Sequence, residues 1–430
     1  MKTFRSQLAL ALIALLSACG GGSDNSAPPA TASFSTAAFV APQSDLFETT
    51  GFAGQLPAFS QFQEQTVREI AHLSTGGSSL KIKLSNEFGT NPLTLDKVHI
   101  AQNLGHGTID PSTDKAVTFS GQTSVTIPAG QVIESDDISF QTKAFMDLSV
   151  SIYMKSAAVR TARRYSETTT YVGPGDLTSS SAIPDATTET SIYYLAGVTV
   201  QRDKKTNVVV AIGDSITEGG ASATIDAYNS WPDQLARLAN AQFEVSIVNA
   251  GLGGNRWVKN TFGPCGVCRI ARDVLNVPGV THVIMALGVN DIGLGYYYSN
   301  TLKDPTQLVT SQQIISAIQE AVSQAKAKGL KVYLGTITPF KGTYYYTSGQ
   351  PNEVPFGSTV PYNGEQVRQE VNAFIRTNTQ IDGVIDFNKT MQDPSDPLHV
   401  RAAWSFDGTL HPNDIGYAHM AQTVDLNTLR

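Results

Sequence analysis

The chain has 430 residues, of which 41% are hydrophobic and 16% charged, and its formal net charge is −7. This length exceeds that of an ordinary single domain, so we expect two domains together with terminal extensions. The negative charge, and the lack of any basic cluster in the sequence, argue against a nucleic acid or an anionic membrane surface as a partner.

The N-terminus has the pattern of an export signal. Lys2 and Arg5 precede an apolar stretch at residues 8–16, which is too short to span a bilayer. A segment of this kind is removed from the mature protein. We therefore expect residues 1–18 to be a signal peptide and the protein to be exported.

The tetrapeptide Leu16-Ser-Ala-Cys19 resembles a bacterial lipobox in all four positions. The resemblance implies a lipoprotein that is cleaved before Cys19 and lipidated on that residue, with a lipid anchor in a membrane. Because residue 20 is Gly rather than Asp, it implies the outer membrane of a Gram-negative host. A plain secretory signal with a chance cysteine is the alternative. Small and polar residues follow, so we expect residues 19–44 to be a flexible tether.

The next part of the chain, residues 45–200, has the pattern of antiparallel strands. Apolar and polar residues alternate at 79–85, 124–127 and 148–153, and turn signals separate these segments. No long helical period intervenes. Short alternating strands with frequent turns predict a β-sandwich of jelly-roll type.

From residue 206 to residue 430 the pattern changes to apolar strands that alternate with helices. The clearest helix is expected at 311–328, with Gly329 after its end, and a second at 364–376. This alternation predicts an α/β domain with a doubly wound parallel sheet and helices on both faces. The expected strands are 208–212, 245–248, 282–287, 331–337 and 384–387.

Cys265 and Cys268 are the two cysteines outside the export segment. A zinc site would need further ligand pairs with suitable spacing, and the sequence offers none. Redox chemistry of the thioredoxin type is possible, but its fold context is lacking. In an oxidising exported compartment we expect a short-range disulfide between them. We predict neither a metal nor a cofactor.

The run of β-branched residues at 208–212 ends abruptly in Gly213-Asp214-Ser215. A buried strand therefore delivers a serine hydroxyl to the C-terminal edge of a sheet, where ligands bind in open α/β folds. A serine is a weak nucleophile until a base removes its proton, so a histidine and an oxyanion hole are required. Three later segments, 249–255, 286–291 and 407–413, are expected at the same rim.

Together these four segments resemble the four sequence blocks of the SGNH (GDSL) hydrolase superfamily. The resemblance covers essentially all of residues 207–430 and implies a flavodoxin-like α/β fold. The whole chain, with its preceding β-domain, looks like a bacterial and fungal branch of arylesterases and carbohydrate acylesterases. Further signs of that branch are the sequences at 288–293, 338–340 and 368–376.

The resemblance also implies residue roles. Ser215 aligns with the nucleophile and His411 with the general base. The oxyanion hole would comprise the backbone N–H groups of Ser215 and Gly254 and the side-chain amide of Asn290. Glycine permits a close approach of the backbone, and an asparagine amide is a neutral donor to developing negative charge.

The chain departs from the superfamily pattern beside the histidine. The family usually has an aspartate three positions before it, but Gly408 stands there and Asp407 lies four before. We expect Asp407 to orient His411. The alternative is a dyad in which a backbone carbonyl orients the ring.

We therefore expect a serine esterase that hydrolyses short-chain acyl esters, most plausibly acetyl esters, of carbohydrate or of aryl and alkyl alcohols. Its partners would be small esters or acylated polysaccharides. One alternative is a lipase, lysophospholipase or thioesterase that acts on longer acyl chains. Another is a non-catalytic, glycan-binding surface lipoprotein. The tyrosines at 296–298 and 344–346 are expected in loops near the rim, where they serve packing or the stacking of sugar and aryl groups.

Overall fold

The computed structural model describes residues 33–46, 59–220 and 222–430. The predicted signal peptide, the lipidation site Cys19 and the first part of the predicted tether lie outside the described residues. Within the described ranges, no helix combines the length and apolar character needed to cross a bilayer. Residues 33–430 form one compact unit with two regions, the β-region (residues 33–202) and the α/β-region (residues 207–430).

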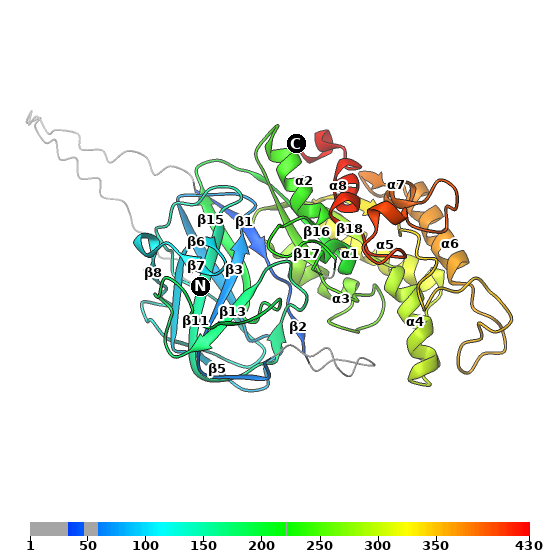
Figure 1. The fold of residues 1–430 in the computed structure, drawn as a ribbon. Coiled ribbons are helices and arrows are strands. Elements are labelled where there is room, and N and C mark those ends of the chain that lie inside the picture. Colours follow the sequence, from blue (N-terminus) through cyan, green and yellow to red (C-terminus); the bar gives the residue numbers. More distant parts are fainter. Residues whose placement is uncertain (1–32, 47–58, 221) are drawn as a thin grey trace, which may run out of the picture. The chain divides into compact units, whose positions relative to one another are not determined.

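The β-region contains two antiparallel sheets (Figure 1). The first has the order β1 (Phe34–Val40), β15 (Leu195–Arg202), β4 (Ser79–Ser85) and β10 (Val132–Glu134). The second has the order β14 (Thr187–Glu189), β13 (Thr170–Pro174), β3 (Gln61–His72), β11 (Asp147–Ala158), β6 (Lys97–Gly105) and β7 (Thr108–Ile109), with β8 (Lys115–Ala116) on β6. Smaller elements are the pairs β2 (Ser44–Asp45) with β12 (Thr161–Ala162) and β5 (Leu93–Leu95) with β9 (Val125–Ile127), and the 3₁₀ helix η1 (Pro111–Thr113).

Alternating side chains from the two sheets share one hydrophobic core. On β4, Leu80 and Ile82 are buried, and on β11 Val150 and Ile152 are buried in the same cluster. Because successive residues of a strand point to opposite faces, this period-two pattern places one face of each sheet inward. The prediction of an antiparallel sandwich is therefore confirmed.

The predicted tether is wrong for residues 34–40, which form strand β1 and pair with β15. Ala37 and Ala38 are buried there. The Ala37 amide donates to the carbonyl of Pro278 at 2.9 Å, and its carbonyl accepts from the Ser246 hydroxyl at 2.6 Å. Small side chains suit this close approach between two regions, but small residues are also typical of a tether, and this is why the pattern misled.

The α/β-region is built on a five-stranded parallel sheet. Its order is β17 (Val245–Gly251), β16 (Asn207–Gly213), β18 (Val280–Ala286), β19 (Lys331–Gly335) and β20 (Gly383–Ile385). In chain order these strands run 2-1-3-4-5, which is the flavodoxin-like arrangement. The predicted fold class is confirmed, although β19 and β20 are shorter than expected.

Helices connect these strands (Figure 1). Helix α5 begins with a capping box in which Thr310 and Gln313 exchange hydrogen bonds, and Gly329 follows its end at φ +82°. The tyrosines at 296–298 lie in helix α4, not in the loop predicted for them. The helices are α1 (Ser215–Glu218), α2 (Trp231–Asn240), α3 (Gly266–Ile270), η2 (Ala271–Leu275), α4 (Val289–Thr301), η3 (Pro305–Gln307), α5 (Ser311–Ala327), α6 (Gly364–Thr377), α7 (Phe387–Met391), η4 (Ala402–Trp404), α8 (Asp414–Gln422) and η5 (Leu426–Leu429).

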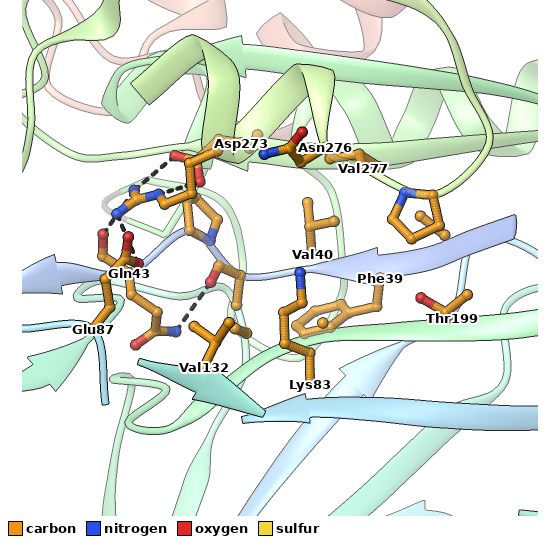
Figure 2. A pocket seen from close by; sticks show the side chains of 18 of the residues that line it. Phe39, Val40, Gln43, Lys83, Glu87, Val132, Thr199, Asp273, Asn276 and Val277 are labelled. Atoms are coloured by element: carbon orange, nitrogen blue, oxygen red, sulfur yellow. Dashed lines mark hydrogen bonds and ion pairs between the residues drawn. The ribbon is translucent and has the colours of Figure 1, made fainter. Parts of the chain in front are cut away.

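A pocket of about 390 Å³ lies where the first sheet of the β-region meets η2 (Figure 2). Phe39 and Lys83 line its sheet side, and Asn276 lines its helix side. At one end, Arg272 is paired with Asp273 at 2.6 Å and with Glu87 at 3.0 Å. These ion pairs tie the two regions together because Glu87 belongs to the β-region.

Candidate active site

The candidate nucleophile lies at the turn that ends strand β16. Asp214 caps helix α1 by accepting the amide of Ile216 at 3.0 Å, and Ser215 is the first residue of that helix. A side chain at Gly213 would lie 1.9 Å from the Thr217 hydroxyl, so only glycine fits there. The turn therefore holds Ser215 at the C-terminal edge of the sheet, as the sequence predicts.

Three predicted site residues form a continuous chain of contacts. The Ser215 hydroxyl oxygen lies 3.0 Å from Nε2 of His411, and Nδ1 of His411 lies 2.7 Å from a carboxylate oxygen of Asp407. An ionised carboxylate only accepts hydrogen bonds, so it assigns the ring proton to Nδ1 and leaves Nε2 as an acceptor for the serine hydroxyl.

The loop before His411 accommodates the extra residue through Gly408. Gly408 has φ +76°, a conformation that favours glycine, and its amide donates to the Ser405 hydroxyl at 2.9 Å. The Asp407 side chain then turns back toward the ring. It is this carboxylate, and not the backbone carbonyl of the dyad alternative, that lies against Nδ1.

Hydrogen bonds hold Asp407 in its charged form. Burial alone would raise the pKa of this carboxyl, but the hydrogen bond from His411 and those from the amides of Leu410 (2.7 Å) and Thr409 (2.9 Å) hold it well below its usual range. Asp407 is therefore a carboxylate near neutral pH, suited to stabilise a positively charged imidazole.

Gly254 and Asn290, predicted as oxyanion donors together with the backbone N–H of Ser215, border the same pocket as Ser215. Gly254 has φ +69°, and a side chain there would lie 2.1 Å from the ring of Phe262. The amide of Asn290 donates one N–H to the carbonyl of Asn255 at 3.2 Å, so its second N–H remains for a ligand. This arrangement can stabilise negative charge on an oxygen beside the serine.

Two buried aspartates near the site support the loops. Asp291 accepts the amides of Trp257 at 2.6 Å and Val258 at 3.0 Å. Burial raises its pKa, and burial raises the pKa of Asp214 to about 7. Both contact backbone amides, and we expect them to have structural roles.

The pocket around Ser215, called the Ser215 pocket below, has a volume of about 460 Å³. Tyr165, Glu218 and Phe262 line it, and the sequence pattern pointed to none of them. Glu218 lies three residues after Ser215 on α1, so its closeness to the nucleophile in the sequence could have indicated it. Tyr165 lies far away in the chain, between two strands and outside any motif. The full lining is Tyr165, Ser215, Glu218, Gly253, Gly254, Phe262, Asn290, Leu294, Gly342, Thr343, Tyr344, Tyr345, Asp407, Thr409, Leu410 and His411.

Cys265 and Cys268 form the predicted disulfide, with Cα atoms 4.9 Å apart. Cys265 is also the N-cap of helix α3, directly after the loop that carries Gly254. In the part of the chain that the structure describes, no group of three His, Cys, Asp or Glu side chains is placed to hold a metal ion.

Comparison with protein families gives one match: the GDSL-like Lipase/Acylhydrolase family, over residues 211–419. No curated protein matches the chain. Among solved structures, an aryl esterase from M. smegmatis is 17% identical with a TM-score of 0.36, and the match covers 52% of this chain and 100% of that one. A carbohydrate acetylesterase from Sinorhizobium meliloti is 13% identical with a TM-score of 0.35, covering 50% and 94%. A GDSL-like lipase from Bacteroides thetaiotaomicron is 19% identical with a TM-score of 0.34, covering 50% and 84%.

The family match begins inside strand β16 and ends in helix α8, so it contains every residue of the contact chain from Ser215 to Asp407. Residues 211–419 are therefore a domain of the GDSL-like lipase/acylhydrolase family, and the chain that carries them is a hydrolase.

Proposed function

We propose that the chain is a serine esterase that removes short acyl groups, above all acetyl, from carbohydrate or from aryl and small alkyl alcohols. The observation that carries this proposal is the contact chain from Ser215 through His411 to Asp407 at the edge of the Ser215 pocket. An ester carbonyl above Ser215 would meet both a nucleophile and hydrogen-bond donors.

Each step follows from these atoms. The Ser215 oxygen attacks the carbonyl carbon while Nε2 of His411 takes the hydroxyl proton, and Asp407 stabilises the imidazolium. The carbonyl oxygen becomes negatively charged, and the donors of Gly254 and Asn290 stabilise it. Collapse breaks the bond to the alcohol, which leaves with the proton from His411. Water then attacks the carbonyl carbon of the acyl-enzyme while Nε2 of His411 takes a proton from it. His411 returns this proton to the Ser215 oxygen, and the carboxylic acid is released.

The lining of the Ser215 pocket favours short acyl groups over long ones. Among the described residues of this lining, Leu294 and Leu410 are the aliphatic side chains, and the other side chains are aromatic or polar. A long alkyl chain needs a continuous apolar surface, whereas aromatic side chains with polar neighbours suit a sugar or aryl ring. This composition favours esterase activity over the alternative of a lipase or thioesterase.

Substitution of the nucleophile tests the proposal. Ser215→Ala should abolish hydrolysis of p-nitrophenyl acetate, with an unchanged circular dichroism spectrum and melting temperature. A folded variant that retains turnover would contradict the assignment. Wild-type rates on the acetate, butyrate and octanoate esters separate the two enzyme classes, because the highest rate on octanoate would favour the lipid-acting alternative. Acetate release from acetylated polysaccharides would then identify the alcohol.

We further propose that the protein is an exported lipoprotein, anchored through Cys19 in the outer membrane. The sequence Leu16-Ser-Ala-Cys19 supports this, as does the Cys265–Cys268 disulfide, because such bonds persist in oxidising compartments. In fractionated cells, the wild type should be in the membrane fraction and Cys19→Ser should leave it. An unchanged distribution would contradict the anchor.

A further inference from the structure

One residue of the Ser215 pocket comes from the β-region. Tyr165 lies on the segment between strands β12 and β13, and every other described residue of the lining belongs to the α/β-region. The segment at residues 163–169, called the β12–β13 loop below, therefore reaches from one region into the candidate active site of the other.

Buried polar side chains hold the β12–β13 loop beside the nucleophile. Arg163 pairs with Glu218 of helix α1 at 3.7 Å, and both side chains are buried. Glu167 accepts the amide of Ser230 at 3.2 Å, and its own carbonyl accepts the amide of Asp226 at 2.7 Å. Movement of the loop would separate these buried polar groups from their partners, so the contacts resist it.

Glycines after the nucleophile make room for the same loop. A side chain at Gly220 would lie 1.3 Å from the carbonyl oxygen of Tyr165, and one at Gly219 would lie 2.0 Å from the Glu167 carboxylate. Tyr165 itself has φ +54°, which is unfavourable for an aromatic residue. A strained backbone persists only where its surroundings determine it strongly, so the tyrosine is held in one position.

The contacts divide the lining of the Ser215 pocket into two sides. A side chain at Gly253 would lie 3.4 Å from the Tyr165 ring, and one at Gly254 would meet Phe262, so these residues form the side beside the oxyanion donors. On the other side, a side chain at Gly342 would lie 2.8 Å from Thr409, in the loop that carries His411.

The chemistry of ester cleavage assigns a substrate group to each side. His411 must protonate the leaving oxygen, so the alcohol lies on the side of His411 and Thr409. The acyl group is bonded to the same carbon and extends in another direction, so it must lie against lining residues other than those beside His411. We propose that Tyr165, supplied by the β-region, closes the acyl side of the Ser215 pocket and sets the length of the acyl group that the enzyme accepts. This inference rests on the esterase function proposed above.

The test compares kcat/KM for the p-nitrophenyl esters of acetate and hexanoate. In Tyr165→Ala the ratio of hexanoate to acetate should rise about 10-fold or more, because removal of the ring opens space for additional methylenes. Tyr165→Phe retains the ring and should retain the wild-type ratio. Should the alanine variant fail to fold, Tyr165→Gly provides the same opening and suits the positive φ.

Two further variants serve as matched controls. Tyr153→Ala removes a tyrosine from strand β11, outside the lining of the Ser215 pocket, and should leave both rates unchanged. Tyr344→Ala removes a different ring of the pocket, from the segment in which a side chain at Gly342 would meet Thr409. It should alter rates with different alcohols without raising the hexanoate ratio.

The outcomes separate the two proposals. A wild-type enzyme without activity on any ester would contradict the esterase function itself. An active and folded Tyr165→Ala variant with the wild-type acyl profile would overturn the role of Tyr165. An equal rise of the ratio in Tyr344→Ala would overturn the assignment of the two sides.

Discussion

One buried arginine of the β-region, Arg68, and one of the α/β-region, Arg269, have different roles. In the β-region, Arg68 on strand β3 is fully buried, and the hydrogen bonds of its guanidinium go to uncharged groups. Its neighbour Glu69 accepts backbone amides of Tyr193 and Leu195. The partners of Arg68 are the Ser151 hydroxyl and the carbonyls of Gly107, Leu177, Ser180 and Ser181.

In the α/β-region, Arg269 of helix α3 is equally buried but connects the candidate active site. It pairs with Asp273 at 3.1 Å and donates to the carbonyls of Gly213 and Ala250, each at 2.8 Å. It also donates to the side chain of Asn255 at 2.9 Å. Gly213 precedes the Asp214-Ser215 turn, and the carbonyl of Asn255 accepts a hydrogen bond from the side-chain amide of Asn290.

The difference teaches that a buried arginine can serve stability at one position and the alignment of a site at another. Arg68 fixes surface loops on a sheet, so its loss should lower stability alone. Arg269 fixes the ends of the two strands that lead to the nucleophile and the oxyanion donors, so its loss should also lower activity. Four predictions test how residues of the two regions contribute to activity and to stability.

The largest effect is expected at Asp407, whose carboxylate contacts Nδ1 of His411. Asp407→Asn should lower kcat about 10⁴-fold, because an amide that donates to Nδ1 of His411 stabilises the wrong tautomer. The melting temperature should change little, since the asparagine oxygen can still accept loop amides. Steady-state kinetics and thermal unfolding measure both quantities. A kcat near that of wild type would favour a dyad of serine and histidine.

The arginines themselves come next. Arg269→Met and Arg68→Met each leave several buried acceptors without a donor, so both should lower the free energy of unfolding by about 3–5 kcal/mol. Only Arg269→Met should also lower kcat, by about 10-fold or more, because small displacements misalign reacting groups. Urea unfolding and kinetics at a temperature where both variants are folded measure the two effects. Equal loss of kcat in both would break the contrast.

The disulfide lies in the α/β-region beside the oxyanion loop. The double variant Cys265→Ser with Cys268→Ser should lose about 2 kcal/mol of stability, because the bond closes a short loop. Reduced wild-type protein should show the same loss. If a reductant also lowers the melting temperature of the double variant, the loss of stability does not come from the disulfide.

The last prediction concerns the pH dependence of stability. Burial raises the pKa of Glu69 from its ordinary value of 4.5 to about 8, and its hydrogen bonds from backbone amides oppose this shift. Between these values the folded protein holds a proton that the unfolded chain releases, so stability falls as the pH rises through this window. In Glu69→Gln the melting temperature should fall less between these limits. Part of the slope should remain, because burial also raises the pKa of Glu218 to about 8. An unchanged slope would contradict this assignment.

Sequence patterns predicted the α/β-region more completely than the β-region. The strands of a parallel sheet are buried on both faces, so the valines of β16 give a strong local signal. The roles of Ser215 and His411 also followed from local motifs, whereas Asp407 was expected from its closeness to His411 in the sequence. Tyr165 could not be predicted in this way, because it reaches the Ser215 pocket through tertiary contacts between two regions. Strand β1 was not predicted for a related reason, because residues distant in sequence bury its alanines.

The position of β1 has a consequence for folding kinetics. Of the described strands, β1 is synthesised first, but its hydrogen-bonding partner β15 begins at Leu195, and the Ala37 amide also donates to the carbonyl of Pro278. Contacts between such distant residues form slowly, because the intervening chain must be ordered before they form. Until then the edge of β15 stays open to pairing with other chains. We therefore expect the pairing of β1 with β15 to limit the rate at which the protein folds.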